Sequence, residues 1–484
     1  MGSFPCLMAT TESSGPAPAL RIFVVLMLGV CIAIMYGMRA DLSVGVERMQ
    51  PTWEEGWTGP VLSSFFVGYI VGNIPSSRLA KRHGARAVLA AGVLVASAAN
   101  AVLPFVAATP GLVMALRVLC GLAQACTFPC AYQLLYAWTT PDTRSRAVTS
   151  SMSLGTAAGT ASGFFVSQQL LVRYDLVGCF GVWTVLSALW ALVWLLLVPA
   201  QCPDHLHGHA SHAPSGACGK EPEVGFAQLA LQPTLLVLYA CHVAANFINY
   251  GLLTQLPLFL SSSLHASPAV LAAGTTLPYL ANVVLANLAA TVADSLITSG
   301  RMSRTRVRKV STAIGIGGSG VLLYAAGCAE DASSAVGFVI AANGALGLAQ
   351  PGWQSLYLDA FGELSGTAYS YSNTLATLAG IAAPVIASTF VRRLGETAGY
   401  RATFLVFGPL FGLPAVAVFC WVASAMRVTS LVRGASAAGG LECARDDALS
   451  LSSLMSRGDE SMSSPPSPDD PQDTDENFKP RNRV

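Results

Sequence analysis

The stretch of sequence that decides the fold runs from Val224 to Ala293. It reads VGFAQLALQPTLLVLYACHVAANFINYGLLTQLPLFLSSSLHASPAVLAAGTTLPYLANVVLANLAATVA and contains no Asp, Glu, Lys or Arg. A helix that crosses a bilayer needs about 20 mostly apolar residues, because lipid offers no hydrogen-bond partners to the backbone. The stretch therefore predicts two membrane-spanning helices joined by a short turn.

The composition of the whole chain agrees with a membrane protein. Of its 484 residues, 53% are hydrophobic and only 11% are charged, whereas soluble domains carry about 25% charged residues. This difference argues against one large soluble enzyme. A net charge of +1 argues against a broadly basic protein that binds nucleic acid. No HExxH, P-loop or nucleophile-elbow motif is present, so we do not expect an enzyme.

Twelve segments are apolar enough to cross a membrane, and we expect an all-α membrane protein. The predicted spans are 22–41, 58–77, 87–107, 112–136, 147–170, 177–199, 230–256, 269–292, 310–328, 334–356, 367–390 and 402–426.

A polar linker divides these spans six and six. We predict a cytoplasmic N-terminal segment at 1–21, an N-terminal bundle at 22–199, a cytoplasmic linker at 200–229 and a C-terminal bundle at 230–426. Residues 427–484 are rich in Ser, Pro and Asp and predict a disordered cytoplasmic tail. The linker carries His205, His207, His209 and His212, which fit either a solvated linker or a metal site.

Basic residues gather in the loops that follow the even-numbered spans. They are Arg78, Lys81, Arg82 and Arg86 after the second span, Arg144 and Arg146 after the fourth, and Arg301, Arg304, Arg306, Arg308 and Lys309 after the eighth. The positive-inside rule places such loops in the cytoplasm. Both termini are then cytoplasmic, and the membrane itself is either the plasma membrane or that of an organelle.

The two halves resemble each other, because each carries a basic cluster after its second span. Two similar halves that enclose one cavity at the midplane are typical of alternating-access transporters. Gly155, Gly159 and Gly163 recur every four residues in the fifth span, a pattern that lets helix backbones approach closely in lipid. We therefore expect a major-facilitator-type fold with two pseudo-symmetric six-helix bundles.

Motifs along residues 22–426 resemble the anion:cation symporter family, which includes sialin, the vesicular glutamate transporters, animal phosphate cotransporters and plant plastid-type phosphate transporters. The motifs are YGMRADLSV at 36–44, LSSFFVGYI at 62–70, Arg117 with TFP at 127–129, RSR at 144–146, LPYL at 277–280, VRK at 307–309 and SNT at 372–374. The resemblance implies transport of phosphate or a small organic carboxylate.

Arg39 is the first candidate for binding an anion. A guanidinium matches a carboxylate or phosphate with two parallel hydrogen bonds, and the resemblance associates this position with anion binding. The alternative is an arginine at a helix end that reaches the interface. Arg117 has the same two interpretations. Asp41 stands two residues after Arg39 and does not share its helix face.

Gln124, which we also expect to contribute to substrate binding, departs from the family pattern. Many relatives carry a glutamate at this position that is tied to proton coupling, and glutamine cannot titrate. The substitutes that we consider are Asp41, His242, Na⁺ coupling and uniport driven by the membrane potential. His242 is a candidate because histidine titrates near physiological pH.

Polar side chains within apolar spans could line the substrate path by hydrogen bonding, or could hold helices together. They are Asn246, Tyr250, Tyr279 and Asn373. We expect Lys81, Arg82, Arg86 and Asp294 to belong to a cytoplasmic gate.

The leading hypothesis is a secondary active transporter of small anions, without a cofactor other than a coupling ion, Na⁺ or H⁺. We expect a functional monomer whose partners are a small anionic substrate and the lipid bilayer. The alternative is a non-transporting sensor or scaffold that retains the fold.

Overall fold

The computed structural model describes residues 18–49, 52–53, 57–199 and 226–423. The chain divides into two compact units, residues 1–429 and 430–484, and the second unit lies outside the described residues. So do most of the predicted linker, with its four histidines, and the predicted N-terminal segment up to residue 17. The described residues form helices and the turns between them, without a β-strand.

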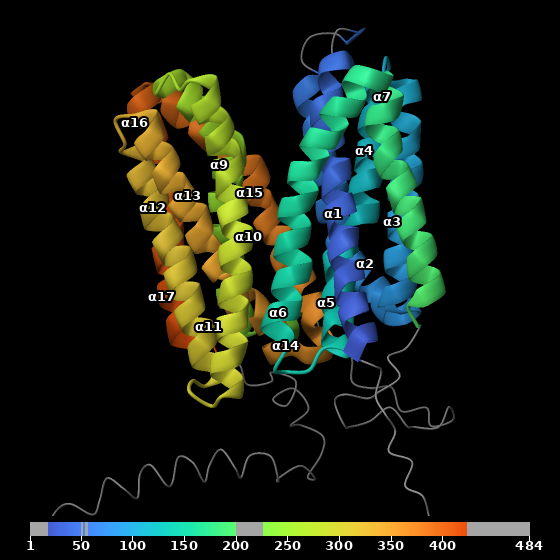
Figure 1. The fold of residues 1–484 in the computed structure, drawn as a ribbon, viewed down its shortest axis with the longest axis vertical. Coiled ribbons are helices and arrows are strands. Elements are labelled where there is room, and N and C mark those ends of the chain that lie inside the picture. The colour runs from blue at the N-terminus through green and yellow to red at the C-terminus, as the bar shows by residue number, and fades with distance from the viewer. Residues whose placement is uncertain (1–17, 50–51, 54–56, 200–225, 424–484) are drawn as a thin grey trace, which may run out of the picture. The chain divides into compact units, whose positions relative to one another are not determined.

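The N-terminal helices form one bundle (Figure 1). Its elements are α1 (Pro18–Met49), α2 (Thr58–His83), α3 (Ala85–Val102) with the 3₁₀ turn η2 (Leu103–Val106), α4 (Pro110–Gln124), α5 (Thr127–Trp138), α6 (Arg144–Val148), the π-helix η3 (Thr149–Leu154) and α7 (Gly155–Leu197). Helix α7 contains two spans, because Asp175 has a φ of 56° and breaks the helical path.

The C-terminal helices form a second bundle. Its elements are α8 (Phe226–Ala230), α9 (Pro233–Leu258), η4 (Phe259–Ser263), α10 (Pro268–Thr298), α11 (Arg304–Thr312), η5 (Ala313–Gly317), α12 (Gly318–Gly327), α13 (Ala332–Leu348), η6 (Gln350–Gln354), α14 (Ser355–Phe361), η7 (Gly362–Leu364), α15 (Ser365–Leu394), α16 (Glu396–Leu405), η8 (Val406–Leu410) and α17 (Phe411–Val422).

Within the described residues, which end at 423 in the last span, each of the twelve predicted spans falls on helical structure. Nine helical segments of the described chain are long and apolar enough to cross a membrane. Two of them, Arg144–Leu197 and Ala332–Leu394, have 54 and 63 residues, which is room for two crossings each at about 20 residues per crossing. Helix α2 adds a further 26-residue helix. The fold is therefore an all-α membrane fold that is consistent with twelve spans.

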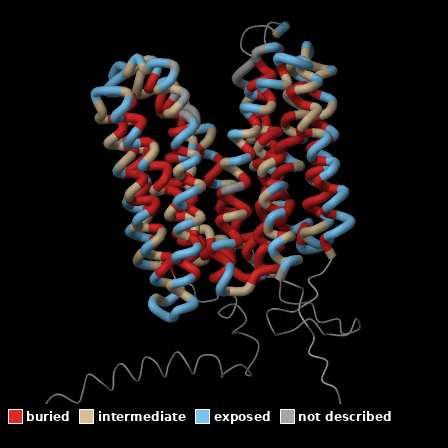
Figure 2. Tube along the Cα trace, in the orientation of Figure 1, coloured by how far each residue is buried: buried red, intermediate tan, exposed pale blue. Residues whose placement is uncertain are grey.

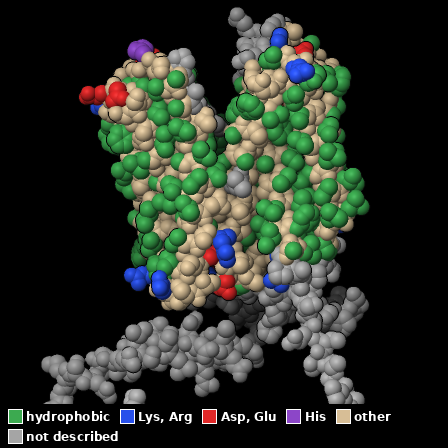
Figure 3. Space-filling view, viewed as in Figure 1, with side chains coloured by type: hydrophobic (Ala, Val, Ile, Leu, Met, Phe, Trp, Pro, Cys, Tyr) green, Lys and Arg blue, Asp and Glu red, His purple; other side chains and the backbone are tan. Residues whose placement is uncertain are grey.

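The outer faces of the helices suit contact with lipid. Large apolar side chains are strongly exposed there, including Val172 at 73%, Leu196 at 72% and Val385 at 62%. Figure 3 shows hydrophobic side chains along the flanks and charged side chains mainly at the two ends of the helices. The buried residues face the interior of each bundle and the region where the bundles meet (Figure 2).

The three glycines spaced by four residues in α7 let this helix pack closely on α1. A Cβ atom at Gly159 would lie 2.4 Å from the carbonyl oxygen of Ala33, and one at Gly155 would lie 2.8 Å from that of Gly29. Real Cβ atoms do not approach backbone this closely, so a side chain at either position must push the helices apart. The close helix contact expected from this glycine pattern is confirmed.

We predict that Gly159→Ala destabilises the protein, although alanine favours a helix more than glycine does. Overpacking against the α1 backbone should lower the free energy of unfolding by about 1–3 kcal/mol. Gly181→Ala is the matched control, because Gly181 lies on the same helix and nothing lies within 4 Å of its missing Cβ. Thermal melts in detergent should show a lower Tm for Gly159→Ala alone, and equal melts for both variants would refute the packing account.

Candidate functional site

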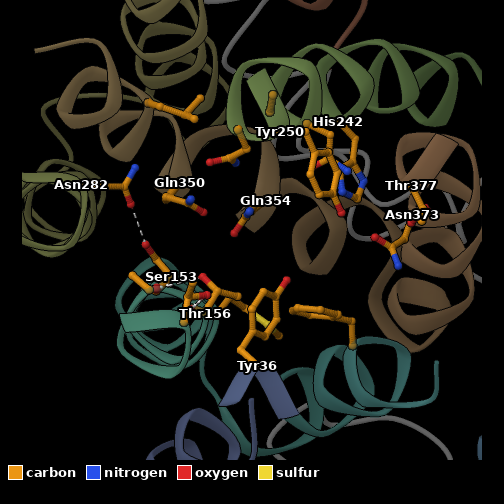
Figure 4. Close-up of a pocket in the computed structure, with 18 of the residues that line it drawn as sticks. Tyr36, Ser153, Thr156, His242, Tyr250, Asn282, Gln350, Gln354, Asn373 and Thr377 are labelled. Atoms are coloured by element: carbon orange, nitrogen blue, oxygen red, sulfur yellow. Dashed lines mark hydrogen bonds between the residues drawn. The ribbon is translucent and has the colours of Figure 1, made fainter. Parts of the chain in front are cut away.

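A cavity of about 170 Å³ lies between the two bundles. Both bundles contribute to its wall (Figure 4). The lining residues are Tyr36, Arg39, Tyr69, Phe128, Met152, Ser153, Thr156, Ala157, Thr160, His242, Ala245, Asn246, Asn249, Tyr250, Tyr279, Asn282, Asn343, Leu346, Gln350, Trp353, Gln354, Tyr369, Asn373 and Thr377.

Among the described residues that form this wall, Arg39 is the single Lys or Arg side chain, and none is Asp or Glu. The Arg39 Nε atom donates a hydrogen bond to Gln124 Oε1 at 3.0 Å. Its Nη2 atom is buried and has no hydrogen-bond partner of good geometry. Because glutamine is neutral, this contact leaves the positive charge of Arg39 without a carboxylate to compensate it.

Aromatic rings surround the Arg39 guanidinium and hold it in place. Its Cζ atom lies 4.4 Å from the ring centroid of Tyr36 and 4.8 Å from those of Phe65 and Tyr69. A ring face attracts a cation by about 0.5–2 kcal/mol, so three rings stabilise the charge in part. They also carry no net charge, and the site as a whole stays cationic.

The opposite side of the cavity comes from the C-terminal bundle and is rich in amides. Asn246 on α9 donates to the carbonyl oxygen of Ala376 at 3.0 Å. Gln350 and Gln354 on η6 project into the cavity (Figure 4), and each leaves its Oε1 atom buried without a hydrogen-bond partner. A carboxamide offers both donors and acceptors, so these side chains can bind hydroxyl or carboxylate groups of a ligand.

His242 also faces the cavity from α9. Its Nδ1 atom is 2.9 Å from Ser372 Oγ, and its ring lies 4.8 Å from that of Trp353. The histidine therefore joins α9 to α15 while it lines the cavity.

Two hydrogen-bonded contacts join the bundles beside the cavity. Asn373 Nδ2 on α15 donates to the Tyr69 hydroxyl and to Asn73 Oδ1 on α2, both at 3.0 Å. Ser153 Oγ on η3 donates to Asn282 Oδ1 on α10 at 3.2 Å. Asn373 is thus both a wall residue and a bridge between the bundles.

The structure places the predicted substrate residues in two groups. Arg39, Asn246, Tyr250, Tyr279 and Asn373 line the cavity, whereas Arg117 and Gln124 lie behind its wall inside the N-terminal bundle. Of the two predicted coupling residues, His242 lines the cavity and Asp41 does not. Among the described residues, no group of three or more His, Cys, Asp and Glu side chains is placed to hold a metal ion.

An ion cluster that the sequence did not reveal closes one end of the cavity. Asp359 on α14 accepts hydrogen bonds from Arg144 Nη1 on α6 at 3.1 Å and from Arg308 Nε on α11 at 2.9 Å. Arg308 also donates to Ser145 Oγ at 2.7 Å. All three charged residues are almost fully buried. We call this end, the lower end in Figure 1 where α6, α11 and α14 lie, the closed end. At the opposite end Figure 3 shows the surface hollowed between the bundles.

The predicted gate residues occupy different places. Asp294 on α10 accepts from the backbone amide and the Nε atom of Arg146 at 3.0 and 3.2 Å, so it joins the bundles at the closed end. Arg86 instead donates to the carbonyl oxygen of Leu195 within the N-terminal bundle. Lys81 and Arg82 are exposed at the end of α2.

A signal for the missed cluster was present in the sequence. Asp359 is the one charged residue between Ala332 and Phe361. A lone carboxylate in an apolar segment needs a partner from elsewhere in the chain, but the sequence does not say which cation supplies it.

We predict that Asp359→Asn destabilises the closed end, because it leaves two buried guanidinium groups without a counter-charge. Removing one partner of a buried ion pair costs about 3–5 kcal/mol. Asp142→Asn is the control: its pair with Arg304 is 3.6 Å long and Asp142 is 61% exposed, so the loss should be about 0–1 kcal/mol. Thermal melts of both variants in detergent test this, and an unchanged Tm for Asp359→Asn would contradict it.

Comparison with known proteins identifies the family of this chain. A family model described as the Major Facilitator Superfamily matches residues 19–384. A putative inorganic phosphate cotransporter of Drosophila melanogaster is 28% identical over 424 residues, which cover 77% of this chain and 79% of that protein. Human sialin is 28% identical over 374 residues, covering 74% and 75%. Vesicular glutamate transporter 2.1 of Danio rerio is 26% identical over 417 residues, covering 77% and 69%.

Solved structures agree on the fold. A double Trp mutant of the transporter XylE aligns with a TM-score of 0.68 at 14% identity and covers 83% of this chain and 95% of its own. The transporter FucP in the outward conformation aligns with a TM-score of 0.60 at 13% identity, covering 82% and 99%.

Proposed function

We propose that this chain, which belongs to the major facilitator superfamily and, within it, to the anion:cation symporter family, carries a small anion across the membrane. It would bind the anion at Arg39 and alternate the access of its central cavity between the two sides. The substrate would occupy the cavity between the bundles. The Nη2 atom of Arg39, which has no hydrogen-bond partner of good geometry, would donate to the anion.

The uncompensated charge of Arg39 carries this proposal. A buried charge is costly unless it is paired, and the nearest hydrogen-bond partner of Arg39 is the neutral amide of Gln124. An anion in the cavity would supply the missing counter-charge. The site would then bind anions in preference to cations and neutral molecules of the same size.

The composition of the wall favours an organic carboxylate over inorganic phosphate. Phosphate at neutral pH carries between one and two negative charges, whereas the wall offers a single cation. The remaining polar groups are amides, hydroxyls and the imidazole of His242, and the rings of Trp353 and Tyr369 offer apolar surface. We therefore propose a monovalent carboxylate with further polar groups on its carbon skeleton.

Alternating access requires the closed end to open. In that step the bundles would separate Arg144 from Asp359 and Arg146 from Asp294. In both pairs the cation belongs to the N-terminal bundle and the carboxylate to the C-terminal bundle. Opposite charges on facing surfaces favour this closed state until substrate and coupling ion shift the equilibrium.

A sensor or scaffold without transport is the less favoured alternative. The chain combines a cationic cavity with ion pairs between the two bundles, and a scaffold needs neither. Uptake measurements separate the two functions directly.

We predict that purified protein in liposomes takes up a labelled carboxylate and that Arg39→Ala abolishes this uptake. Sialate, glutamate and phosphate would be offered in parallel, with Na⁺, a proton gradient or a membrane potential imposed one at a time. Loss of a charge-assisted hydrogen bond costs about 1.5–3 kcal/mol, or about 10- to 150-fold in affinity. Arg173→Ala is the control, because Arg173 is exposed on α7. Undiminished uptake by Arg39→Ala would refute the site, and no uptake by the wild type would favour the sensor.

We also predict that Gln124→Glu makes uptake more dependent on pH. A carboxylate at this position would accept the Arg39 Nε hydrogen bond and neutralise the guanidinium, so the anion should bind more weakly when this carboxylate is ionised and recover when it is protonated. Gln124→Leu removes the hydrogen bond without adding a charge and serves as the control. A pH profile equal to that of the wild type would show that Gln124 does not act on the anion site.

A further inference from the structure

A second buried polar cluster lies inside the N-terminal bundle, away from the cavity wall. Asn100 on α3 donates from Nδ2 to Asp41 Oδ2 on α1 at 2.9 Å, and both residues are 0% exposed. The other oxygen of each side chain, Asp41 Oδ1 and Asn100 Oδ1, is buried without a hydrogen-bond partner. Two buried acceptors without a donor point to a group that is missing between them.

The groups that face Asp41 come from each helix packed around it. They are Asn100 from α3, Arg117 and Cys120 from α4, Cys179 from α7, whose Sγ lies 3.5 Å from the Asp41 carbonyl oxygen, and the backbone amide of Leu42 from α1 itself. Apolar side chains, among them Leu42, Leu103 and Phe180, pack near the cluster.

A proton fits the missing group better than a metal ion does. A protonated carboxyl gains one O–H donor, which can satisfy an acceptor that now lacks a partner. A sodium ion would need several oxygen ligands and would lie close to the Arg117 guanidinium, which repels it. The cluster thus has the composition of a site that binds one proton.

We propose that Asp41 is the proton-carrying group of this transporter and that its protonation is coupled to anion binding at Arg39 through Arg117. This inference rests on the proposed function. It also accounts for the neutral residue at Gln124, because the coupling carboxylate then lies elsewhere in the same bundle.

The coupling follows from contacts that Arg117 makes with the anion site. Arg117 Nη1 donates a hydrogen bond to the carbonyl oxygen of Met38 at 3.1 Å. Met38 directly precedes Arg39 in the chain. The ring of Phe65 lies 5.2 Å from Arg117 Cζ and 4.8 Å from Arg39 Cζ. Both guanidinium groups therefore lie close to the Phe65 ring, and the charge of each contributes to the electrostatic potential there.

The sign of the coupling is set by the charge of Asp41. An ionised Asp41 compensates part of the positive charge of Arg117, which lies beside the anion site, and so weakens the attraction for an anion. Protonation forms an O–H bond on Asp41 with a proton from a hydronium ion of the solvent, which becomes water; it removes this negative charge and strengthens anion binding. By linkage, a bound anion must favour protonation to the same extent.

The charge balance makes a distinct prediction about energetics. One proton and one monovalent anion together carry no net charge. Accumulation should therefore follow the pH gradient and should not respond to an imposed membrane potential.

The test combines binding and proton uptake for the wild type and Asp41→Asn. Labelled sialate, glutamate and phosphate are the probes, and whichever binds is titrated across the pH range. Wild-type affinity should fall by up to about tenfold per pH unit once Asp41 ionises. Asp41→Asn should bind at every pH as the wild type does at low pH, and should exchange anions without proton-driven accumulation. Asp331→Asn is the control, because Asp331 is exposed at the start of α13 and asparagine also caps a helix.

Several results would overturn the inference. The first is an anion affinity that depends equally on pH in the wild type and in Asp41→Asn. The second is a pH dependence that persists in Asp41→Asn and disappears in His242→Gln. The third is anion accumulation that requires Na⁺. If Asp41→Asn does not fold, wild-type liposomes still decide, because anion uptake without proton uptake contradicts the proposal. Arg39-dependent anion binding that is independent of pH would leave the proposed function intact and remove only this coupling, whereas no anion binding at all would remove both.

Discussion

A guanidinium that is partly buried without a carboxylate partner is the constraint on which the rest of this molecule depends. Placing such a charge between helices in a membrane is unfavourable unless something compensates it. Three aromatic rings and the amide of Gln124 stabilise Arg39 in part, and a bound anion would complete the compensation. The same low-dielectric surroundings that make the charge costly also strengthen its attraction for an anion.

In the function that we propose, the charges of the two bundles serve binding and gating at separate places. The cavity holds Arg39, which would attract an anion, and the closed end holds Asp359 and Asp294 with arginines from the facing bundle. Ion pairs suit a gate that must open, because each separated partner can be solvated by the water that enters. Glycines such as Gly159 act in a different way, since they fix the helices within one bundle and let it move as a unit.

Much of the fold could be predicted from the sequence, and less of the site. Runs of apolar residues locate spans because the bilayer sets their length, and the family is confirmed. The rotation of each helix was harder to predict, because a span that is apolar on all sides has no polar face to orient it. For this reason the sequence did not show that Arg117 and Gln124, which we expected to bind substrate, lie behind the cavity wall. It also did not show that Gln350 and Gln354 lie in the wall. Asp359 was missed because its partners, Arg144 and Arg308, lie far away in sequence.

The most direct test of the central claim is to locate a bound anion in an experimental structure of the protein. The anion would be the one that shows saturable uptake in liposomes. This account predicts an anion oxygen within hydrogen-bond distance of Arg39 Nη2, at about 2.7–3.2 Å, with the amides of η6 on its other side. An anion bound only at the arginines of the closed end, with Arg39 still enclosed by its aromatic rings, would contradict it.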